Sequence, residues 1–190
     1  MTDALAAELA RTRAVFDSVE HPFPEQTGAT EAELQRVEDE TGITLAGDLA
    51  DLYRLMDGSD YEKVLAVRSD ELTALNFSSL ADALSLWRAT SEIAEAEREL
   101  DREAVPDGRI RHAAWANPQW FPFAEFNAGS TSVYYDADPG PGGTVGQVIV
   151  YQHDPDGVYY VAPDFLSFLR MSNELLAANA QECVVEYSGV

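Results

Sequence analysis

Cysteine, long apolar runs and a leader-like amino terminus are scarce or missing in this chain of 190 residues. The single cysteine, Cys183, excludes an internal disulfide and a cysteine-based zinc site, and its valine neighbours at 184 and 185 predict a buried thiol in a late strand. No uninterrupted apolar run approaches the roughly 20 residues of a membrane-spanning helix. The first residues lack the basic and apolar parts of a signal peptide. We therefore expect a cytoplasmic protein that folds without disulfides.

Basic residues are also scarce. Lys and Arg together number 12, against 34 Asp and Glu, so the formal net charge is −22. Direct binding to nucleic acid or to anionic lipid needs cations facing phosphates, and we expect neither. An acidic protein attracts basic partners and repels its own copies. The alternative is that the acidity serves only solubility.

The few basic residues are also unevenly placed. No Lys or Arg occurs between Arg111 and Arg170, although that stretch carries Glu125, Asp136, Asp138, Asp154, Asp156 and Asp164. An acidic face is expected there unless distant arginines fold over it. Lys63 is the only lysine. Because arginine favours paired, bidentate contacts, many of the other cations are expected in intramolecular ion pairs.

Apolar and aromatic residues are present in ordinary amounts, 46 % and 10 % of the chain. A chain of this length forms one domain, with or without appendages. Periodicity and capping signals predict helices over 2–20, 30–41, 48–56, 79–104 and about 163–179. The expected end signals are an N-cap at Thr2, a capping box of Thr30 with Glu33, a C-cap at Gly42 and a first helical residue at Pro163. Alternating and β-branched runs predict strands over 61–68, 72–77, 131–135, 145–151 and 158–162, with an edge strand over 183–187. The order indicates an α+β fold, a mainly antiparallel sheet covered by helices.

No chemical motif emerges from these elements. The Gly140–Gly143 run contains proline and lies among aspartates, which favours a rigid loop over a phosphate cradle. The aspartates near it lack the spacing of a calcium loop, so solvated turns are preferred. The three histidines are far apart, and Trp115 with Trp120 favours core packing over a sugar platform. We expect no catalytic residue, metal or cofactor.

Two stretches of the chain carry a family resemblance. The first runs from Thr30 to Leu45 and continues through Asp48-Leu49 and 52–55. The second runs through 120–123, 135–149, 153–154 and 162–169, with an Asp-Pro-Gly-Pro-Gly-Gly loop before Gly-Gln-Val. In this order they resemble the SUKH superfamily of Smi/Knr-type proteins. Ala46 and Asp57 depart from the usual pattern, which leaves the partner open.

The resemblance implies an α+β binding module and not an enzyme. It divides the chain into an N-terminal helical arm (1–29), a Smi/Knr-like domain (30–178) and a C-terminal tail or edge strand (179–190). Bacterial relatives are taken to be immunity proteins of toxin systems, and fungal relatives to be interaction hubs in cell-wall assembly. The negative charge independently suits a basic partner.

Our first hypothesis is an immunity protein, a monomer or weak homodimer, that occludes the active site of a basic toxin. The alternative is a regulatory scaffold that binds endogenous proteins, and a third, weaker reading is an acid-dependent hydrolase. The interface residues expected for the first hypothesis are Asp136, Asp138, Asp154 and Asp156, with Trp120 and Tyr134 as aromatic anchors. Core packing is the preferred alternative for the two aromatic residues.

Overall fold

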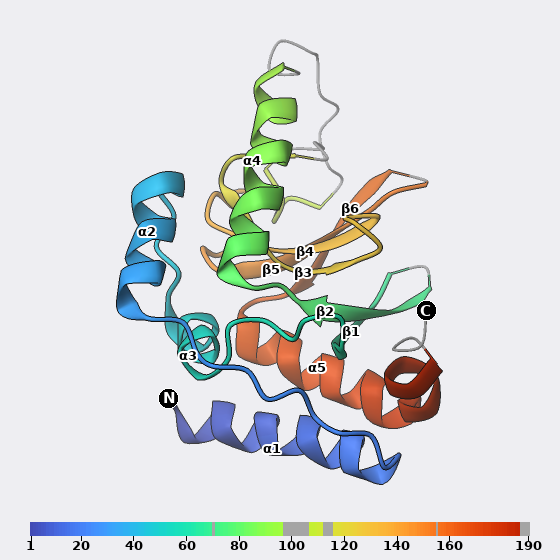
Figure 1. The fold of residues 1–190 in the computed structure, drawn as a ribbon. Coiled ribbons are helices and arrows are strands. Elements are labelled where there is room, and N and C mark those ends of the chain that lie inside the picture. Colours follow the sequence, from blue (N-terminus) through green and yellow to red (C-terminus); the bar gives the residue numbers. More distant parts are fainter. Residues whose placement is uncertain (70, 97–106, 112–115, 155, 187–190) are drawn as a thin grey trace.

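The computed structural model describes residues 1–69, 71–96, 107–111, 116–154 and 156–186. Its helices are α1 (Asp3–Ser18), α2 (Glu31–Thr41), α3 (Gly47–Leu55), α4 (Leu80–Ala96) and α5 (Phe165–Ala178). Its strands are β1 (Lys63–Arg68), β2 (Leu72–Phe77), β3 (Trp120–Phe126), β4 (Thr131–Asp136), β5 (Gln147–Gln152) and β6 (Gly157–Ala162). The six strands pair antiparallel in chain order, which confirms the α+β prediction (Figure 1).

The sheet curls, so that its two edge strands come toward each other. The register shifts between Lys63 and Leu65, between Pro122 and Ala124, and between Val148 and Ile149. Such bulges bend a strand and increase its twist. The Ser69 hydroxyl after β1 donates to the side-chain carbonyl of Gln152 at the end of β5. This contact joins one edge of the sheet to the strand next to the other edge.

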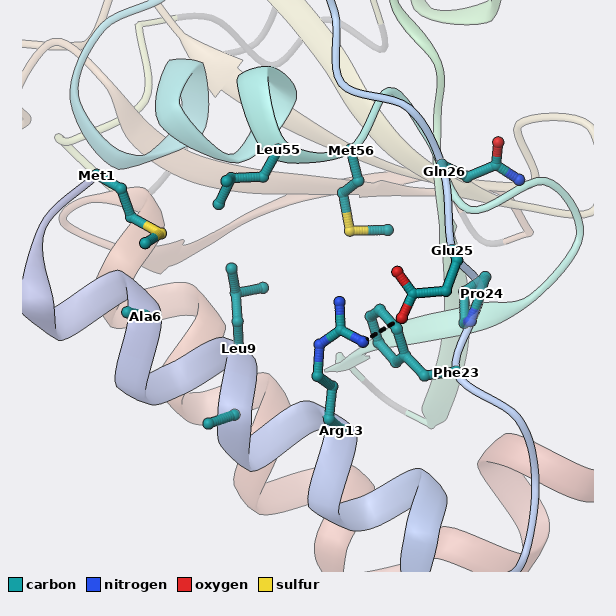
Figure 2. A pocket seen from close by; sticks show the side chains of 11 residues that line it. Met1, Ala6, Leu9, Arg13, Phe23, Pro24, Glu25, Gln26, Leu55 and Met56 are labelled. Atoms are coloured by element: carbon teal, nitrogen blue, oxygen red, sulfur yellow. Dashed lines mark hydrogen bonds and ion pairs between the residues drawn. The ribbon is translucent and has the colours of Figure 1, made fainter.

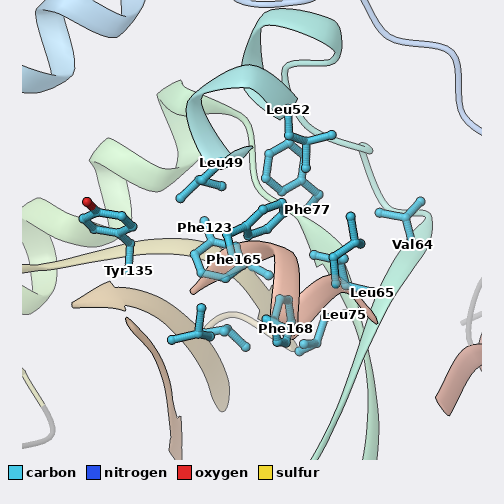
Figure 3. Packing of buried hydrophobic residues seen from close by; sticks show 14 of the residues in the cluster. Leu49, Leu52, Val64, Leu65, Leu75, Phe77, Phe123, Tyr135, Phe165 and Phe168 are labelled. Atoms are coloured by element: carbon cyan, nitrogen blue, oxygen red, sulfur yellow. The ribbon is translucent and has the colours of Figure 1, made fainter. Parts of the chain in front are cut away.

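Helix α5 packs on the inner side of the sheet, and α1 packs on the far side of α5 (Figure 1). The buried core contains a ring cluster in which Phe123 meets Phe165 and Phe168 edge-on, each with ring centroids 5.5 Å apart (Figure 3). Helix α1 is held to α5 by a buried polar contact. Thr12 donates to Asn173 Oδ1 at 2.8 Å, and Asn173 Nδ2 donates to the Glu8 carbonyl at 2.9 Å.

The local signals at the helix ends are confirmed. Thr2 caps α1, accepting from the Leu5 amide at 3.1 Å. Thr30 and Glu33 form the predicted capping box of α2. Gly42 ends α2 in the left-handed conformation, with φ of 70°. These contacts involve residues a few positions apart, which is why the sequence predicts them.

The arginines are largely paired, as predicted. Arg54 contacts Glu31 at 2.6 Å, which ties α3 to α2, and Arg88 contacts Glu40, which ties α4 to α2. Further ion pairs in the described part of the chain join Arg11 to Glu8, Arg13 to Glu25, Arg109 to Asp107, Arg111 to Asp138 and Arg170 to Glu8. Because Asp and Glu greatly outnumber Lys and Arg, the net negative charge comes from carboxylates that have no basic partner.

Two predictions near the C-terminus are wrong. The edge strand over 183–187 is absent from the described part of that segment, because Gln181–Glu186 form a π-helical turn. Cys183 is buried as expected, but in this turn, which packs against β1. Pro163 is not the first helical residue of α5. Asp164 is the N-cap, and its carboxylate accepts from the Ser167 amide at 2.7 Å.

One strand was not predicted, and one predicted helix is described only in part. The aromatic run at 120–126, for which no strand was predicted, forms β3 in the middle of the sheet. Its proline lies beside a bulge, where a missing backbone donor is tolerated. The long helix predicted over 79–104 is described as α4 through Ala96, and its remainder lies outside the described residues.

Candidate functional site

The four predicted interface aspartates do not form one site. Asp136 ends β4, whereas Asp154 and Asp156 lie in the turn between β5 and β6. Asp136 pairs with Gln147 at the start of β5, and Thr131 pairs with Gln152 at its end. Six residues of strand span about 17 Å from first to last, so the two groups lie at opposite ends of the same hairpin.

Asp136 is fully buried and has a structural role. It accepts from Gln147 Nε2 at 2.8 Å and from the Asp138 amide at 3.0 Å. Burial raises the pKa of its carboxyl, and the Gln147 contact partly opposes this. Gln147 Nε2 also donates to the Arg109 carbonyl, at 2.8 Å, so the pair fastens the 107–111 segment to the sheet. Asp136 is not accessible to a partner in this conformation.

The other three aspartates are at the surface or partly exposed. Asp138 pairs with the Arg111 guanidinium at 2.9 Å, a distant arginine folding over the acidic stretch. Asp156 accepts from the Tyr151 hydroxyl and lies beside His153 Nδ1, both at 2.7 Å. The Tyr151 bond, followed by His153, lowers the pKa of Asp156. Asp154 is exposed, with φ of 63°.

Trp120 and Tyr134 are buried. They are therefore core residues, and the hypothesis that they anchor a partner at the surface is wrong. Their rings lie 5.8 Å apart in a second apolar cluster with Ile110, Ile149 and Tyr151. Burial raises the pKa of Tyr134 to about 12. On the outer side of this cluster, the Arg109 guanidinium stacks on Tyr160 at 3.5 Å. The 107–111 segment thus covers this part of the sheet.

A groove that we did not predict lies at the other end of the β3–β4 hairpin. We call it the polar groove, and its volume is about 680 Å³. It is lined by Asp60, Tyr61, Lys63, Asn76, Asp82, Glu125, Phe126, Asn127 and Ala128. Lys63, Asn76 and Glu125 are cross-strand neighbours on β1, β2 and β3. The sheet register therefore brings together residues 62 positions apart in the chain.

The floor of the polar groove holds a half-buried amine and a half-buried carboxylate. Lys63 Nζ donates to Asn76 Oδ1 at 3.2 Å and lies 5.4 Å from the Phe126 ring centroid. Burial lowers the pKa of Lys63 and raises that of Glu125, and each charge partly offsets the effect on the other. Asp60 and Asp82 add two further carboxylates. Among the lining residues, negative charge exceeds positive charge by two.

The rim of the polar groove has the features of a contact surface. Tyr61 is 90 % exposed, although large aromatic side chains are usually covered. Asp60, Asn127 and Ala128 all have positive φ, between 50° and 52°. For alanine this conformation costs about 1 kcal/mol or more, and such strain is common at functional sites. The single lysine was the one sequence signal that pointed here.

A second hollow, of about 300 Å³, lies between α1, the 23–26 linker and the end of α3 (Figure 2). Its walls are mostly apolar and include Leu9, Leu55 and Met56. An ion pair between Arg13 and Glu25 crosses its side, and Arg13 also stacks on Phe23 at 4.4 Å (Figure 2). This hollow contains no grouping of acid, base and nucleophile.

The residues that the structure describes form neither a metal site nor a membrane-spanning helix. No cluster of three or more His, Cys, Asp or Glu in these ranges is arranged to hold a metal ion. None of the described helices combines the length and apolarity needed to cross a bilayer.

The chain is similar in sequence to known proteins. The model of the SMI1 / KNR4 family (SUKH-1) matches residues 28–171. A fission-yeast protein, the Schizosaccharomyces pombe cell wall biosynthesis/cell cycle regulator smi1, is 30 % identical over 153 residues, 76 % of this chain. The Neurospora crassa glucan synthesis regulatory protein is 32 % identical over 120 residues, 62 % of this chain. The Saccharomyces cerevisiae cell wall assembly regulator SMI1 is 31 % identical over 80 residues, 42 % of this chain.

The matched regions are small parts of those relatives. They cover 30 % of the fission-yeast protein, 21 % of the Neurospora protein and 15 % of the budding-yeast protein. The family model nevertheless covers most of the present chain, from before α2 into α5. The chain belongs to the SMI1/KNR4 family (SUKH-1).

Proposed function

We propose that this protein is a non-catalytic binding module that regulates cell-wall assembly by holding partner proteins. It acts in the cytoplasm as a monomer or weak homodimer. The polar groove carries the proposal, because it combines a preformed cavity, an exposed tyrosine and excess negative charge on one surface. The names of the fungal relatives, which describe regulators of cell-wall and glucan synthesis, support the process.

The polar groove suits an arginine or lysine side chain of a partner. Glu125 is half-buried, so a partner cation reaching it gains more than it would at a fully exposed carboxylate. Tyr61 supplies an aromatic face that is free to stack on a guanidinium. Tyrosine and arginine are enriched among the residues that dominate interface energies. The groove therefore offers one aromatic contact and one charged contact to the same ligand side chain.

The test is affinity capture from native lysate with the wild-type protein and two variants. Tyr61→Ala removes the exposed ring, and Leu55→Ala, an exposed apolar residue at 41 % in the other hollow, is the matched control. Capture of several endogenous proteins that is lost in Tyr61→Ala and kept in Leu55→Ala supports the proposal. Equal capture by both variants overturns the assignment to the polar groove.

An immunity protein that occludes a basic toxin is a second candidate, favoured by the net charge of −22. It requires one stoichiometric basic partner whose association slows as salt is raised. Co-expression with a toxin domain encoded beside this gene then restores growth. Capture of several endogenous, substoichiometric partners together with no rescue would rule out this candidate in favour of the scaffold.

A further inference from the structure

Strand β6 is an edge of the sheet with an open outer side. It pairs with β5 on its inner side, and in the described ranges no backbone group pairs with its outer side. Its sequence, Gly157-Val-Tyr-Tyr-Val-Ala162, contains no charge and no proline. Natural edge strands usually carry a charged residue or a proline, or are covered by another segment, which prevents pairing with another chain. The valine and tyrosine residues of β6 instead favour a strand conformation.

An apolar hollow adjoins this edge, and we call it the edge hollow. It has a volume of about 400 Å³ and is lined on one side by Val161 of β6 and on the other by residues 66–68 of β1 and by Ser69, which follows β1. Helix α5 forms its floor through Phe168, Met171 and Leu175. Because β1 and β6 are opposite edges of the curled sheet, the space between them lies beyond the outer side of β6. Met171 is 45 % exposed there.

The surroundings of β6 are mainly acidic. Asp154 and Asp156 precede the strand, Asp164 follows it, and Glu174 lines the edge hollow. The cations nearby are Arg68, which also lines the hollow, and Arg109, which pairs with Asp107. A segment that lies along β6 thus has carboxylates at both of its ends. Charge complementarity favours a segment that carries lysine or arginine.

We propose that β6 is a docking edge for an extended, basic segment of a partner protein. The segment adds as a further strand, places an apolar side chain in the edge hollow and directs basic side chains toward the flanking aspartates. A second copy of this chain is a poorer occupant, because two molecules of charge −22 repel each other. This surface is separate from the polar groove, so either can bind a partner without the other.

The probe is a blocked nine-residue peptide of alternating valine and lysine, added to the ¹⁵N-labelled full chain. We expect chemical-shift changes and slowed amide exchange concentrated on β6. A valine–glutamate peptide of the same length tests charge, and a valine–lysine peptide with N-methylated alternate amides tests backbone pairing. Both are expected to bind at least ten-fold more weakly. Equal binding of either control, or no change on β6, overturns the proposal.

Two pairs of variants separate this edge from the rest of the surface. Met171→Glu places a charge in the edge hollow and is expected to weaken peptide binding at least ten-fold. Leu55→Glu, at a similarly exposed position in the hollow between α1 and the end of α3, is expected to leave peptide binding unchanged. The double variant Asp154→Asn with Asp156→Asn is expected to weaken binding several-fold at low salt, whereas Asp39→Asn on α2 is not.

The test of docking at β6 can be distinguished from the test of the polar groove. Tyr61→Ala should not change the peptide affinity, and a loss of affinity in that variant would contradict docking at β6. If Met171→Glu fails to fold, the aspartate variants still decide the question, because each asparagine removes a charge but keeps a side-chain oxygen that can accept from the Tyr151 hydroxyl at position 156. Concentration-dependent shifts on β6 without peptide would identify a second copy as the occupant and overturn the choice of partner.

Discussion

Strands β1 and β6 are the two edges of one sheet, and the fold treats them differently. On β1, the Ala66 amide donates to the Ser172 hydroxyl of α5 at 2.8 Å, and the η1 turn (Gln181–Glu186) packs alongside. β1 also begins with Lys63 and ends with Arg68. On β6, no comparable contact occurs in the described residues, and the strand itself is uncharged. One edge is closed from within the chain, and the outer side of the other has no such closure among the described residues.

The difference between the two edges comes from helix α5, which contacts the backbone of β1 and leaves the outer side of β6 without such a contact. Helix α5 follows β6 directly in the chain, yet its side chain at Ser172 satisfies a backbone group on β1. The curl of the sheet allows this, because it brings β1 over the helix. We therefore expect changes in α5 to affect β1 first, and changes on β6 to affect association more than stability.

The largest expected effect is that of Phe168→Ala. This side chain is buried between the sheet and α5, where it meets Phe123. Its removal leaves a cavity and should lower the free energy of unfolding by about 3–5 kcal/mol. Urea denaturation measures the change. Met171→Ala, on the exposed side of the same helix, should cost less than about 1 kcal/mol, and equal losses would contradict this packing.

Ser172→Ala tests the closure of β1 itself. It leaves the buried Ala66 amide without an acceptor and should cost about 1–3 kcal/mol. Amide exchange at Ala66 should accelerate by more than the global loss of stability predicts. The exposed Ser85→Ala on α4 is the control and should change stability by about 0.5 kcal/mol or less. Unchanged exchange at Ala66 would show that β1 is protected by something else.

Asp136→Asn tests the polar contact that holds the β4–β5 hairpin, the support of β6. Burial raises the pKa of Asp136 in the native state above its ordinary value of 3.8. As the pH rises from 3.8 through the native pKa, the unfolded chain loses its proton first, and the wild type loses stability. Asparagine has no such titration. The stability of the variant relative to wild type should therefore increase with pH over this window, as measured by urea denaturation at several pH values.

Tyr159→Lys should have the smallest effect on stability. Tyr159 is 39 % exposed on β6, and a lysine there adds the charge that edge strands usually carry. The free energy of unfolding should change by about 0.5 kcal/mol or less. Binding of the valine–lysine peptide should nevertheless fall, because the new charge opposes the basic segment. A large loss of stability would mean that β6 is covered in the native state.

The sequence predicted most elements and few of the long-range contacts. The Thr30 capping box, the Gly42 cap and both strands of the β1–β2 hairpin were predicted from neighbouring residues alone. The family resemblance was confirmed by the match over residues 28–171. The π-helical turn at Gln181–Glu186 was missed, because buried Cys183 and Val184 satisfy a strand pattern as well as a helical one.

The candidate site was less predictable than the fold. Carboxylates close in sequence, such as Asp136 and Asp154, turned out to lie at opposite ends of a hairpin, since a strand of six residues separates them. Conversely, Lys63 and Glu125 are distant in sequence, and the register of three strands brings them together. Side-chain type alone did not show which carboxylates would be buried.

The sequence by itself determined the acidic charge, the helix ends and most strand positions, because each depends on composition or on residues a few positions apart. It also indicated the family, through the order of motifs along the chain. Only the tertiary structure decided that Trp120 and Tyr134 are core residues, that the polar groove exists, and that β1 is closed while β6 is open. Those features depend on the curl and register of the sheet. Curl and register are set by packing between distant segments, which no local pattern records.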